Sequence, residues 1–556
     1  MIKKLIYFVV IVFVASTFNF TATASFHKLF SESNPKGKKK CFSRITAYFK
    51  YKDGDYKEAL RIYRELYELN KNDAKINYQI GKCNVALQNM EEAIQYLIKA
   101  NKLNARLVDK HSHFFLGQAY QYLGKLDSAI MEYNIYKNSI SPRKIINDPV
   151  NELLSQTETA QYLLSHPVNI KINNLGKDVN SEFDEGMPLI SPGDKTLIFT
   201  SRRSDTKGGG IDPNSGQYYD DIYFANWEDG SNKWTPASGL EGDLNTTGHD
   251  ACIGISPDGN TLFVYKNIPK VTGSGDIYFS TKKTDGKWSI PKAMGKPVNS
   301  SFFEGSCSLS PDENTIYFIS ERNGGYGNAD IWKSNKIGKN LWDKPENLGA
   351  VINTDGDEMC VFMHSDGKTL YFISNGHNTM GGYDVFKSEM KADSSWSEPQ
   401  NLGYPINTTK DELTFSLTLD GKKAYLTSNR ENGLGGTDIY EIDMSNYIIP
   451  SEKDSSIKQV NSNFAIFKGS VIESNSAQQV DAIIVIKELA TGKQVYQLFT
   501  NDLGDYFVSL ESGKEYEISV DKPGFKKYYE KITLPSNKDK SNVLVKLIIL
   551  EKITQE

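Results

Sequence analysis

Residues 298–349 decide the fold of the chain, because their pattern is repeated. The stretch runs from Val298-Asn299-Ser300, through Asp330-Ile331-Trp332, to Leu348-Gly349. Its opening Asn and its central Asp both recur 54 residues later, at Asn353 and Asp384. Self-similarity at a fixed period of this length indicates a stacked or radial repeat architecture.

Five copies of this unit follow one another. Each begins at a repeated Asn, at Asn180, Asn245, Asn299, Asn353 and Asn407. Each also carries an Asp before an apolar-aromatic pair, at Asp221, Asp276, Asp330, Asp384 and Asp438. Within a unit, short runs of β-branched and aromatic residues alternate with Gly, Pro, Asn and Asp, which is typical of four strands joined by turns. Four antiparallel strands repeated radially form a propeller blade, so we predict a five-bladed β-propeller over residues 168–445.

The closure of the ring is also predicted from the repeats. A Trp opens the fourth strand of four units, at Trp234, Trp288, Trp342 and Trp396. The fifth unit has no such Trp, but residues 168–176 precede the first unit and share its Leu-Gly ending. We expect this N-terminal strand to complete the fifth blade and to remove an open sheet edge.

The beginning of the chain predicts export. Lys3 and Lys4 precede an apolar run of ten residues, and Ala22-Thr23-Ala24 is typical of a cleavage site. The run is shorter than the roughly 20 residues that a membrane span needs. We therefore expect residues 1–24 to be a signal peptide. The mature chain would begin near Ser25 without a membrane span.

Residues 41–141 show helical periodicity and a second repeat. Small residues recur at Ala59, Ala93 and Ala129, and each is followed four residues later by a large one, at Tyr63, Leu97 and Tyr133. The pattern resembles the tetratricopeptide repeat (TPR), an all-α solenoid whose concave face binds partner proteins. The alternative is that these helices only brace the propeller. Cys41 and Cys83 fall in neighbouring repeats, and whether they form a disulfide stays open.

Three further segments complete the domain organisation. Residues 142–167 are expected to form a capping helix. Residues 446–463 are polar and are expected to be a linker. Residues 464–550 contain short alternating strands with a turn at Thr491-Gly492. They resemble the carboxypeptidase regulatory-like domain, a small non-catalytic sandwich of transthyretin type.

A repeated acid is the strongest candidate for a site. It occurs once in every propeller unit, at Glu185, Asp250, Glu304, Glu358 and Glu412. A ring of carboxylates could hold a cation. However, a residue present in every unit usually bonds a turn, and a catalytic site would break the symmetry. We therefore expect no metal, no cofactor and no enzymatic activity. The net charge of −5 also excludes the electrostatic signature of a nucleic-acid-binding protein.

The whole chain resembles a family of Gram-negative envelope proteins. Phe199-Thr200-Ser201-Arg202-Arg203 and Gly435-Gly436-Thr437-Asp438-Ile439-Tyr440 are similar to the WD40-like PD40 repeat. Family members combine TPR repeats, this propeller and a regulatory-like domain, and some serve type IX secretion or gliding. The resemblance implies a location in the periplasm, in association with the outer membrane. The OmpA-like domain that usually ends these proteins is not recognised after Leu550, so peptidoglycan binding is not expected.

Our first hypothesis is a non-enzymatic envelope scaffold that binds other envelope proteins through the TPR face and the propeller. The candidate contact residues are Tyr120, Tyr122 and Tyr136 on the helices, and Arg202, Arg203, Arg322 and Arg430 after the second strand of three units. Their alternative role is packing and turn salt bridges. The second hypothesis is a glycan-binding or glycan-cleaving propeller. A hydrolase needs two placed carboxylates, and only the insertion in the first unit breaks the symmetry, with Asp212, Tyr218, Tyr219 and Asp220.

Overall fold

The computed structural model divides the chain into two compact units, Met1–Ser141 and Pro142–Glu556. It describes residues 35–104, 106, 108–191, 194–212, 215–256, 259–266, 275–283, 286–310, 315–338, 341–364, 367–418, 421–445, 447, 464–480, 482–500, 505–511, 513–534 and 543–553. The predicted signal peptide, residues 1–24, lies outside the described residues, as does the linker 446–463 apart from Tyr447. Each unit is described by itself.

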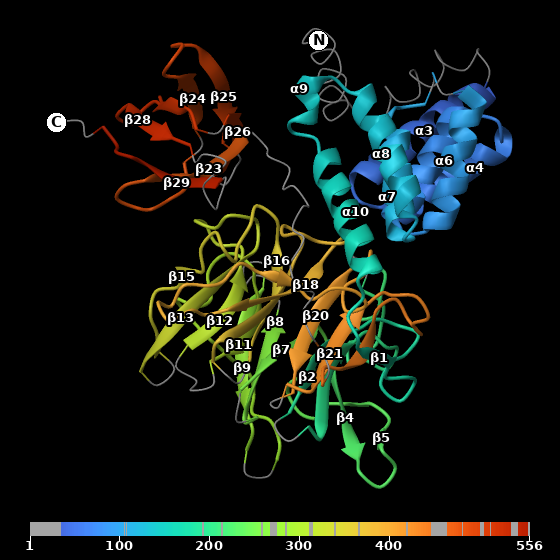
Figure 1. Cartoon of the computed structure of the whole chain (residues 1–556), viewed down its shortest axis with the longest axis vertical. Helices are drawn as coiled ribbons and strands as arrows, with labels where there is room; N and C mark the ends of the chain where they lie inside the picture. Colours follow the sequence, from blue (N-terminus) through green and yellow to red (C-terminus); the bar gives the residue numbers. More distant parts are fainter. Residues whose placement is uncertain are drawn as a thin grey trace, which may run out of the picture. The chain divides into compact units, whose positions relative to one another are not determined.

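The first unit consists of helices that pack in sequence order (Figure 1). They are α3 (Pro35–Lys52), α4 (Tyr56–Leu69), α5 (Ala74–Ala86), α6 (Met90–Asn104), α7 (His111–Tyr122) and α8 (Leu126–Ser139). Asp55 and Asp73 cap the starts of α4 and α5, because their side chains accept hydrogen bonds from the backbone N–H groups of Glu58 and Ile76. The helices extend from Pro35 to Ser139, whereas the sequence predicted a helical region over residues 41–141.

Small residues allow the paired helices of this unit to approach closely. Ala59, Ala93 and Ala129 are fully buried. A Cβ atom at Gly81 would lie 2.5 Å from Leu97, and one at Gly117 would lie 2.4 Å from the ring of Tyr133. The close approach of Gly81 to Leu97 and of Gly117 to Tyr133 is therefore the contact that holds α5 to α6 and α7 to α8.

The second unit begins with two helices, α9 (Pro142–Ile145) and α10 (Val150–Ser165), where the sequence predicted one capping helix over 142–167. Helix α10 buries Val150, Leu154 and Ala160. The Thr159 hydroxyl donates to Asn378 Oδ1 at 2.5 Å, so α10 is attached to the loop between two later strands, β17 and β18.

Five antiparallel sheets follow, one for each predicted repeat unit. The first contains β2 (Glu185–Ile190), β3 (Thr196–Ser201), β4 (Asp221–Glu228), β5 (Lys233–Trp234) and β6 (Ser238–Gly239), and the second β7 (Asp250–Ile255), β8 (Thr261–Lys266), β9 (Asp276–Thr281) and β10 (Lys292–Ala293). The third contains β11 (Glu304–Leu309), β12 (Thr315–Ser320), β13 (Asp330–Gly338), β14 (Leu341–Trp342) and β15 (Glu346–Asn347), and the fourth β16 (Glu358–Met363), β17 (Thr369–Ser374), β18 (Asp384–Glu389) and β19 (Gln400–Asn401). The fifth contains β20 (Glu412–Leu417), β21 (Lys423–Ser428) and β22 (Asp438–Asp443).

The fifth sheet takes its outer strand from the segment before the first sheet. Strand β1 (Lys171–Asn174) pairs antiparallel with β22, with Ile172 opposite Ile442. The sequence predicted this pairing, because the fifth unit lacks the Trp that opens the fourth strand of the other units. We refer to the five sheets together as the five-sheet unit.

The first strands of the five sheets contact one another in cyclic order. Strand β2 contacts β7, β7 contacts β11, β11 contacts β16, β16 contacts β20, and β20 contacts β2. One backbone hydrogen bond recurs at every junction, from the N–H of the repeated acid to the carbonyl that precedes the repeated Asp of the previous sheet. The pairs are Glu185 with Thr437, Asp250 with Asp220, Glu304 with Gly275, Glu358 with Ala329, and Glu412 with Tyr383. Neighbouring sheets are not merged into one closed sheet within the described residues.

A small all-β part ends the chain. Its strands are β23 (Phe464–Glu473), β24 (Ile483–Glu488), β25 (Gln494–Phe499), β26 (Asp505–Glu511), β27 (Glu515–Val520), β28 (Tyr528–Thr533) and β29 (Val543–Leu550). They form two sheets, with the orders β26-β23-β29 and β25-β24-β27-β28. One core joins the sheets, with Phe467 and Ile548 from the first and Ile484 and Ile518 from the second.

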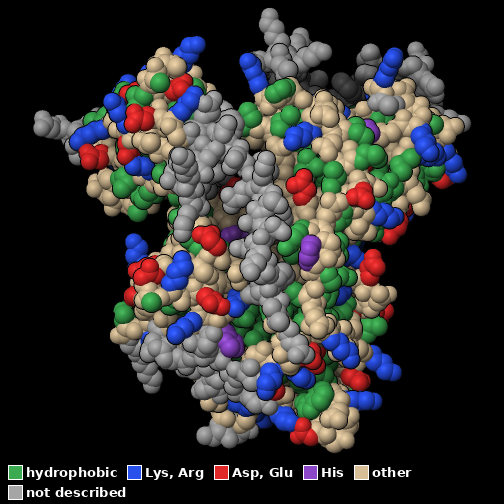
Figure 2. All heavy atoms as spheres, viewed as in Figure 1, with side chains coloured by type: hydrophobic (Ala, Val, Ile, Leu, Met, Phe, Trp, Pro, Cys, Tyr) green, Lys and Arg blue, Asp and Glu red, His purple; other side chains and the backbone are tan. Residues whose placement is uncertain are grey.

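Charged side chains of both signs are interspersed over the visible face of the molecule (Figure 2), in keeping with the small net charge. In the part of the chain that the structure describes, no helix has the length and apolar character needed to cross a membrane.

Candidate functional site

The helical unit carries an aromatic face built from alternate helices. We define the aromatic face as Tyr48 and Tyr51 of α3, Tyr78 and Lys82 of α5, and Phe115 of α7. The Lys82 ammonium lies 4.0 Å from the centroid of the Tyr51 ring and 5.8 Å from that of Phe115. The rings of Tyr78 and Phe115 are 6.3 Å apart. Lys82 therefore connects α3, α5 and α7 on one side of the unit.

The charge at the centre of this face is affected by neighbours of both signs. Burial, followed by the nearby charge of Lys52, lowers the pKa of Lys82, while Cys83 and the carboxylate of Asp109 act in the opposite direction. On the same helices, Arg44 pairs with Asp73, and Nδ1 of His111 lies 2.6 Å from Asp109. Within the described residues, no carboxylate pairs with the Lys82 ammonium. The face thus combines aromatic surface with an unpaired, half-buried cation.

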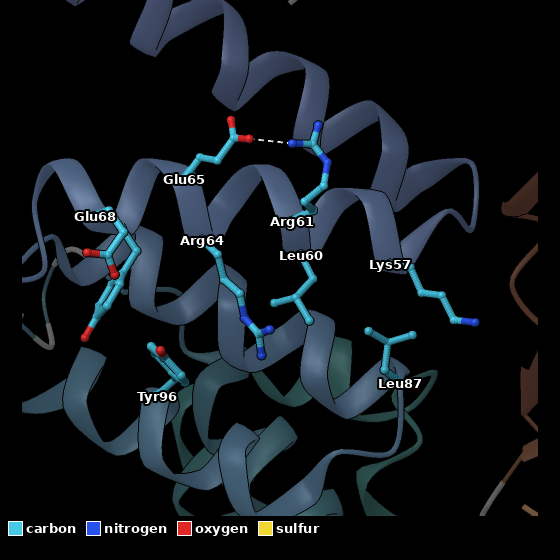
Figure 3. Close-up of a pocket in the computed structure, with 9 residues that line it drawn as sticks. Lys57, Leu60, Arg61, Arg64, Glu65, Glu68, Leu87 and Tyr96 are labelled. Carbon is cyan, nitrogen blue, oxygen red and sulfur yellow. Dashed lines mark hydrogen bonds and ion pairs between the residues drawn. The ribbon is translucent and has the colours of Figure 1, made fainter.

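A pocket of about 520 Å³ lies on the other side of the unit, between α4 and α6 (Figure 3). Its lining comprises Lys57, Leu60, Arg61, Arg64, Glu65, Tyr67, Glu68, Leu87 and Tyr96. Two of its cations are paired within the chain. Arg64 donates to both carboxylate oxygens of Glu92 at 2.8 Å, and Arg61 pairs with Glu58 and Glu65. Two of the three cations that line the pocket are therefore neutralised within the chain.

The three predicted tyrosines lie in different environments. Tyr136 is 1% exposed, and its ring packs against Phe114 at 5.2 Å, so its expected role in partner contact is wrong: it is a core residue. Tyr120 and Tyr122 are half-buried on α7, and Tyr122 donates to Gln88 at 3.2 Å. Sequence reasoning missed Lys82, although its position directly after the repeated Gly81 could have indicated the face opposite the helix contact.

Three of the predicted arginines point into the protein. The side chains of Arg203, Arg322 and Arg430 are 15%, 12% and 13% exposed. Each donates to the repeated acid of its own sheet, at 3.1, 3.2 and 3.2 Å. Each also donates to the backbone carbonyl of the residue before the repeated Asn, at Val179, Val298 and Ile406. This geometry favours the turn salt bridge, which was the alternative interpretation.

The repeated acids hold the turns between sheets. Glu304, for example, accepts the backbone N–H of Ser300 at 2.8 Å and the hydroxyl of Ser320 at 2.9 Å. No group of three or more His, Cys, Asp or Glu side chains in the described part of the chain is arranged to hold a metal ion. Each acid instead serves as an acceptor for donors of its own sheet.

Two sheets break this pattern. In the second sheet, buried Lys266 pairs with Asp250, where the other sheets have a Ser at the end of the strand. In the fourth sheet, Gly376 takes the place of the Arg, and His377 Nε2 lies 2.7 Å from the carbonyl of Ile352. Burial raises the pKa of Glu358 well above its usual range, and no Arg or Lys pairs with it among the described residues.

The insertion in the first sheet forms an asymmetric polar cluster. Asp220 accepts a hydrogen bond from Arg202 at 2.7 Å and lies 2.7 Å from His249 Nδ1. The second nitrogen of His249 is 3.7 Å from Asp212, and the ring of Tyr219 packs on His249 at 4.8 Å. The ring of Tyr218 packs on Phe183 at 5.3 Å.

Burial alone would raise the pKa of Asp220, but hydrogen bonds from His249 and Arg202 lower it, and the same bond raises the pKa of His249. The structure therefore gathers the predicted Asp212, Tyr219 and Asp220 around His249, a residue that the sequence did not single out for this role. Asp220 is therefore paired with Arg202, and both carboxylates lie beside His249.

The thiols of the chain are not paired where they are described. Cys83, Cys252, Cys307 and Cys360 are free and buried. The side chain of Cys41 lies outside the described residues, so the structure offers no support for a bridge between Cys41 and Cys83.

Comparison with known proteins identifies the repeat type of the helical unit. Residues 50–106 match the family model of the tetratricopeptide repeat. Such repeats indicate protein–protein interaction, so the chain has protein partners. No curated protein matches the chain.

Three solved structures illustrate the similarities. The type III secretion translocator chaperone SycD of Yersinia enterocolitica is 15% identical with a TM-score of 0.22, over 24% of this chain and 93% of that one. The TPR2AB domain of yeast Sti1, in complex with pHSP90, is 17% identical with a TM-score of 0.20, over 25% and 53%. A glycoside hydrolase is 9% identical with a TM-score of 0.34, over 52% and 94%. At these TM-scores the similarities carry no argument about this chain.

Proposed function

We propose that the chain is a non-enzymatic scaffold or adaptor of the cell envelope whose helical unit binds a partner protein through the aromatic face. One observation carries the proposal: the half-buried Lys82 and the rings of Tyr51, Tyr78 and Phe115, which come from alternate helices, lie on one side of the repeat. Repeats of this kind bind partner proteins, and partner interfaces are rich in aromatic anchors.

The proposal includes a five-bladed β-propeller. The cyclic contacts of β2, β7, β11, β16 and β20 support it. The recurring backbone hydrogen bond between neighbouring sheets also supports it, since the N–H of Glu185 in the first sheet donates to the carbonyl of Thr437 in the fifth. The pairing of β1 with β22 supports closure between the two ends of the ring. The final strands would form a carboxypeptidase regulatory-like sandwich of transthyretin type, and their shared core supports this.

The proposed location is the periplasm, in association with the outer membrane, with a role in type IX secretion, gliding or other outer-membrane machinery. The support is the sequence resemblance and the predicted signal peptide. The polar cluster of Arg202, Asp220 and His249 favours a second candidate, a glycan-binding propeller, because it is the feature that breaks the symmetry of the sheets. Glycan-array binding that Asp220→Asn abolishes would support this second function.

We expect Tyr48→Ala and Tyr51→Ala together to reduce partner capture by about tenfold or more, because truncating aromatic anchors at an interface typically costs 2 kcal/mol or more. Tyr48 is 48% exposed, so its loss should leave the fold intact, whereas Tyr51 packs against the core of the first helices, so circular dichroism must show that the double variant is folded. The measurement is recovery of crosslinked envelope proteins by tagged mature chain, quantified by mass spectrometry. Tyr529→Ala, at a Tyr of the final strands that is 62% exposed, is the control.

The outcome that would contradict the proposal is equal recovery of the same proteins by wild type and by the double variant. Recovery lost equally in the Tyr529→Ala control would place the partner elsewhere on the chain.

A further inference from the structure

The final all-β part contains an apolar edge strand. Strand β29 ends its three-stranded sheet, because the order of that sheet is β26-β23-β29. It runs parallel to β23, from Val543 opposite Ile466 to Leu550 opposite Glu473. Within the described residues, no strand pairs with its other side. An edge strand presents a row of backbone N–H and C=O groups with which another strand can pair.

Alternate residues of β29 present these backbone groups. The carbonyl of Leu550 accepts the N–H of Ser474, the residue that follows β23, so the backbone groups of Leu550 point toward β23. The groups of successive residues in a strand point to opposite sides, and the parallel ladder is regular from end to end. The N–H and C=O groups of Val545, Leu547 and Ile549 therefore point to the open edge.

The same three residues direct apolar side chains away from the core. Leu547 and Ile549 are exposed and Val545 is half-buried, whereas Ile548 and Leu550 lie in the core between the two sheets. Natural edge strands are protected from pairing by outward charges, Pro or β-bulges. Residues 543–550 contain no Pro, and their ladder with β23 has no bulge. The open edge thus combines free backbone groups with apolar side chains.

The charge that β29 does carry is neutralised within the chain. Lys546 pairs with Glu530 of β28, which is an edge strand of the other sheet. A strand added beside β29 would therefore not leave the Lys546 ammonium without an opposite charge. Strand β28 differs from β29, because it carries the charged Glu530 and Lys531 next to each other. Of these two edge strands, β29 is the one suited to pairing.

The sequence of this edge is complementary to itself in the antiparallel direction. If Leu547 lies opposite the partner's Leu547, then Val545 lies opposite the partner's Ile549, and every residue with free backbone groups meets another such residue. Lys546 then lies opposite the partner's Ile548. A parallel pairing in register would instead place the two Lys546 residues side by side, and like charges in that position are destabilising.

We propose that two copies of the chain pair antiparallel through β29, with Leu547 at the two-fold axis. The pairing forms one continuous sheet with three strands from each copy. The two-fold axis uses both open edges, so association ends at the dimer. One strand from each copy gives an interface at the small end of the range for specific complexes, and we therefore expect the dimer to be reversible.

Sedimentation velocity of the full mature chain over a range of concentrations tests the dimer. Wild type should change from monomer to dimer as concentration rises. Leu547→Lys should raise the dissociation constant by about tenfold or more, because it places two cations opposite each other at the axis. Leu547 is 48% exposed, so the variant should fold, and circular dichroism checks this. Ile483→Lys is the matched control, since Ile483 is 39% exposed on β24, which has neighbours on both sides.

Engineered cysteines test the register. Residues opposite each other in a hydrogen-bonded antiparallel pair have Cα atoms about 5.5 Å apart, a separation that a disulfide can bridge. Under mild oxidation by copper phenanthroline, Leu547→Cys should crosslink with itself. Val545→Cys and Ile549→Cys should crosslink only when the two variants are mixed. Wild type gives the baseline, because its described thiols are buried.

Four results would overturn the inference. A chain that stays monomeric at every concentration would leave the edge to a strand of a different protein. A dimer that Leu547→Lys does not weaken would have its interface elsewhere. Self-crosslinking of Val545→Cys would show a different register or direction. Growth beyond the dimer would show open-ended association in place of a closed pair.

Discussion

Replacing Glu304 with Gln is expected to destabilise the five-sheet unit by about 3–5 kcal/mol, whereas Glu358→Gln is expected to be neutral or slightly stabilising. The two residues occupy the same position in neighbouring sheets, and both are fully buried. The difference lies in the charge that faces them. Glu304 pairs with Arg322, while Glu358 has no Arg or Lys partner among the described residues.

The cost at Glu304 comes from the arginine that would remain. Arg322 is largely buried, and burial lowers its pKa even with Glu304 beside it. Its guanidinium also donates hydrogen bonds to the carbonyls of Pro297 and Val298. The Glu304→Gln substitution leaves these two hydrogen bonds in place. Removing the carboxylate charge would leave a buried cation without an opposite charge beside it, and breaking a buried ion pair in this way strongly destabilises the fold.

At Glu358 the neutral form is already favoured. Burial, followed by the charge of Asp330, raises its pKa well above the usual range. The side chain accepts hydrogen bonds from the Thr354 hydroxyl at 2.9 Å and the Ser374 hydroxyl at 2.8 Å. A Gln carbonyl can accept the same two bonds, so the amide resembles the protonated acid in charge and shape.

The same asymmetry predicts how stability depends on pH. Because the folded pKa of Glu358 lies above the unfolded value, its contribution to stability is complete below the ordinary Glu pKa and is lost as pH rises through the raised pKa. Burial also raises the pKa of Glu412 to about 7, which adds a loss in the same direction. The free energy of unfolding should therefore fall from mildly acidic to alkaline pH, and less steeply in Glu358→Gln.

Tryptophan fluorescence during urea unfolding can measure these changes, because all six Trp lie in the five-sheet unit, at Trp227, Trp234, Trp288, Trp332, Trp342 and Trp396. An equal decrease in the free energy of unfolding for Glu304→Gln and Glu358→Gln would show that Arg322 does not cause the expected difference. An unchanged pH slope in Glu358→Gln would contradict the assignment of that slope to this residue.

The second large effect is expected from Gly117→Val, which should destabilise the helical unit by about 3 kcal/mol or more. Even a Cβ atom at this position would lie 2.4 Å from two carbons of the Tyr133 ring. The ring cannot easily move away, because Tyr133 is fully buried and its hydroxyl donates to Gln121 at 2.7 Å. Overpacking a filled core commonly costs 1–3 kcal/mol, and a rigid aromatic neighbour places this site at the upper end.

Far-ultraviolet circular dichroism follows the helical unit, while the Trp signal follows the five-sheet unit. We expect Gly117→Val to shift the first transition and to leave the second unchanged. Gly230→Val, at an open turn of the five-sheet unit with no atom near its would-be Cβ, is the matched control and should change neither by more than about 0.5 kcal/mol. A helical transition unaltered by Gly117→Val would show that α7 and α8 do not pack as described.

The local elements of this protein could be predicted from the sequence, because they depend on short-range patterns. The 54-residue period predicted the first strand of each sheet behind its repeated acid, and the absent fifth Trp predicted the pairing of β1 with β22. The recurrence of Ala59, Ala93 and Ala129, each followed by a large residue, predicted the helical repeat, and the three alanines are fully buried. A periodic sequence predicts these elements because each repeated unit forms the same strands, turns and helix contacts as the unit before it.

Side-chain environments were decided only by the tertiary structure. Tyr136 of α8 and Tyr48 of α3 are the same residue type, yet Tyr136 lies in the core and Tyr48 is half-exposed. The Arg322 side chain points inward because the Glu304 carboxylate and two backbone carbonyls accept its hydrogen bonds at the end of the strand. The contacts of Lys82 with the rings of Tyr51 and Phe115 depend on three helices, α3, α5 and α7, and no local sequence pattern contains the distances between those helices.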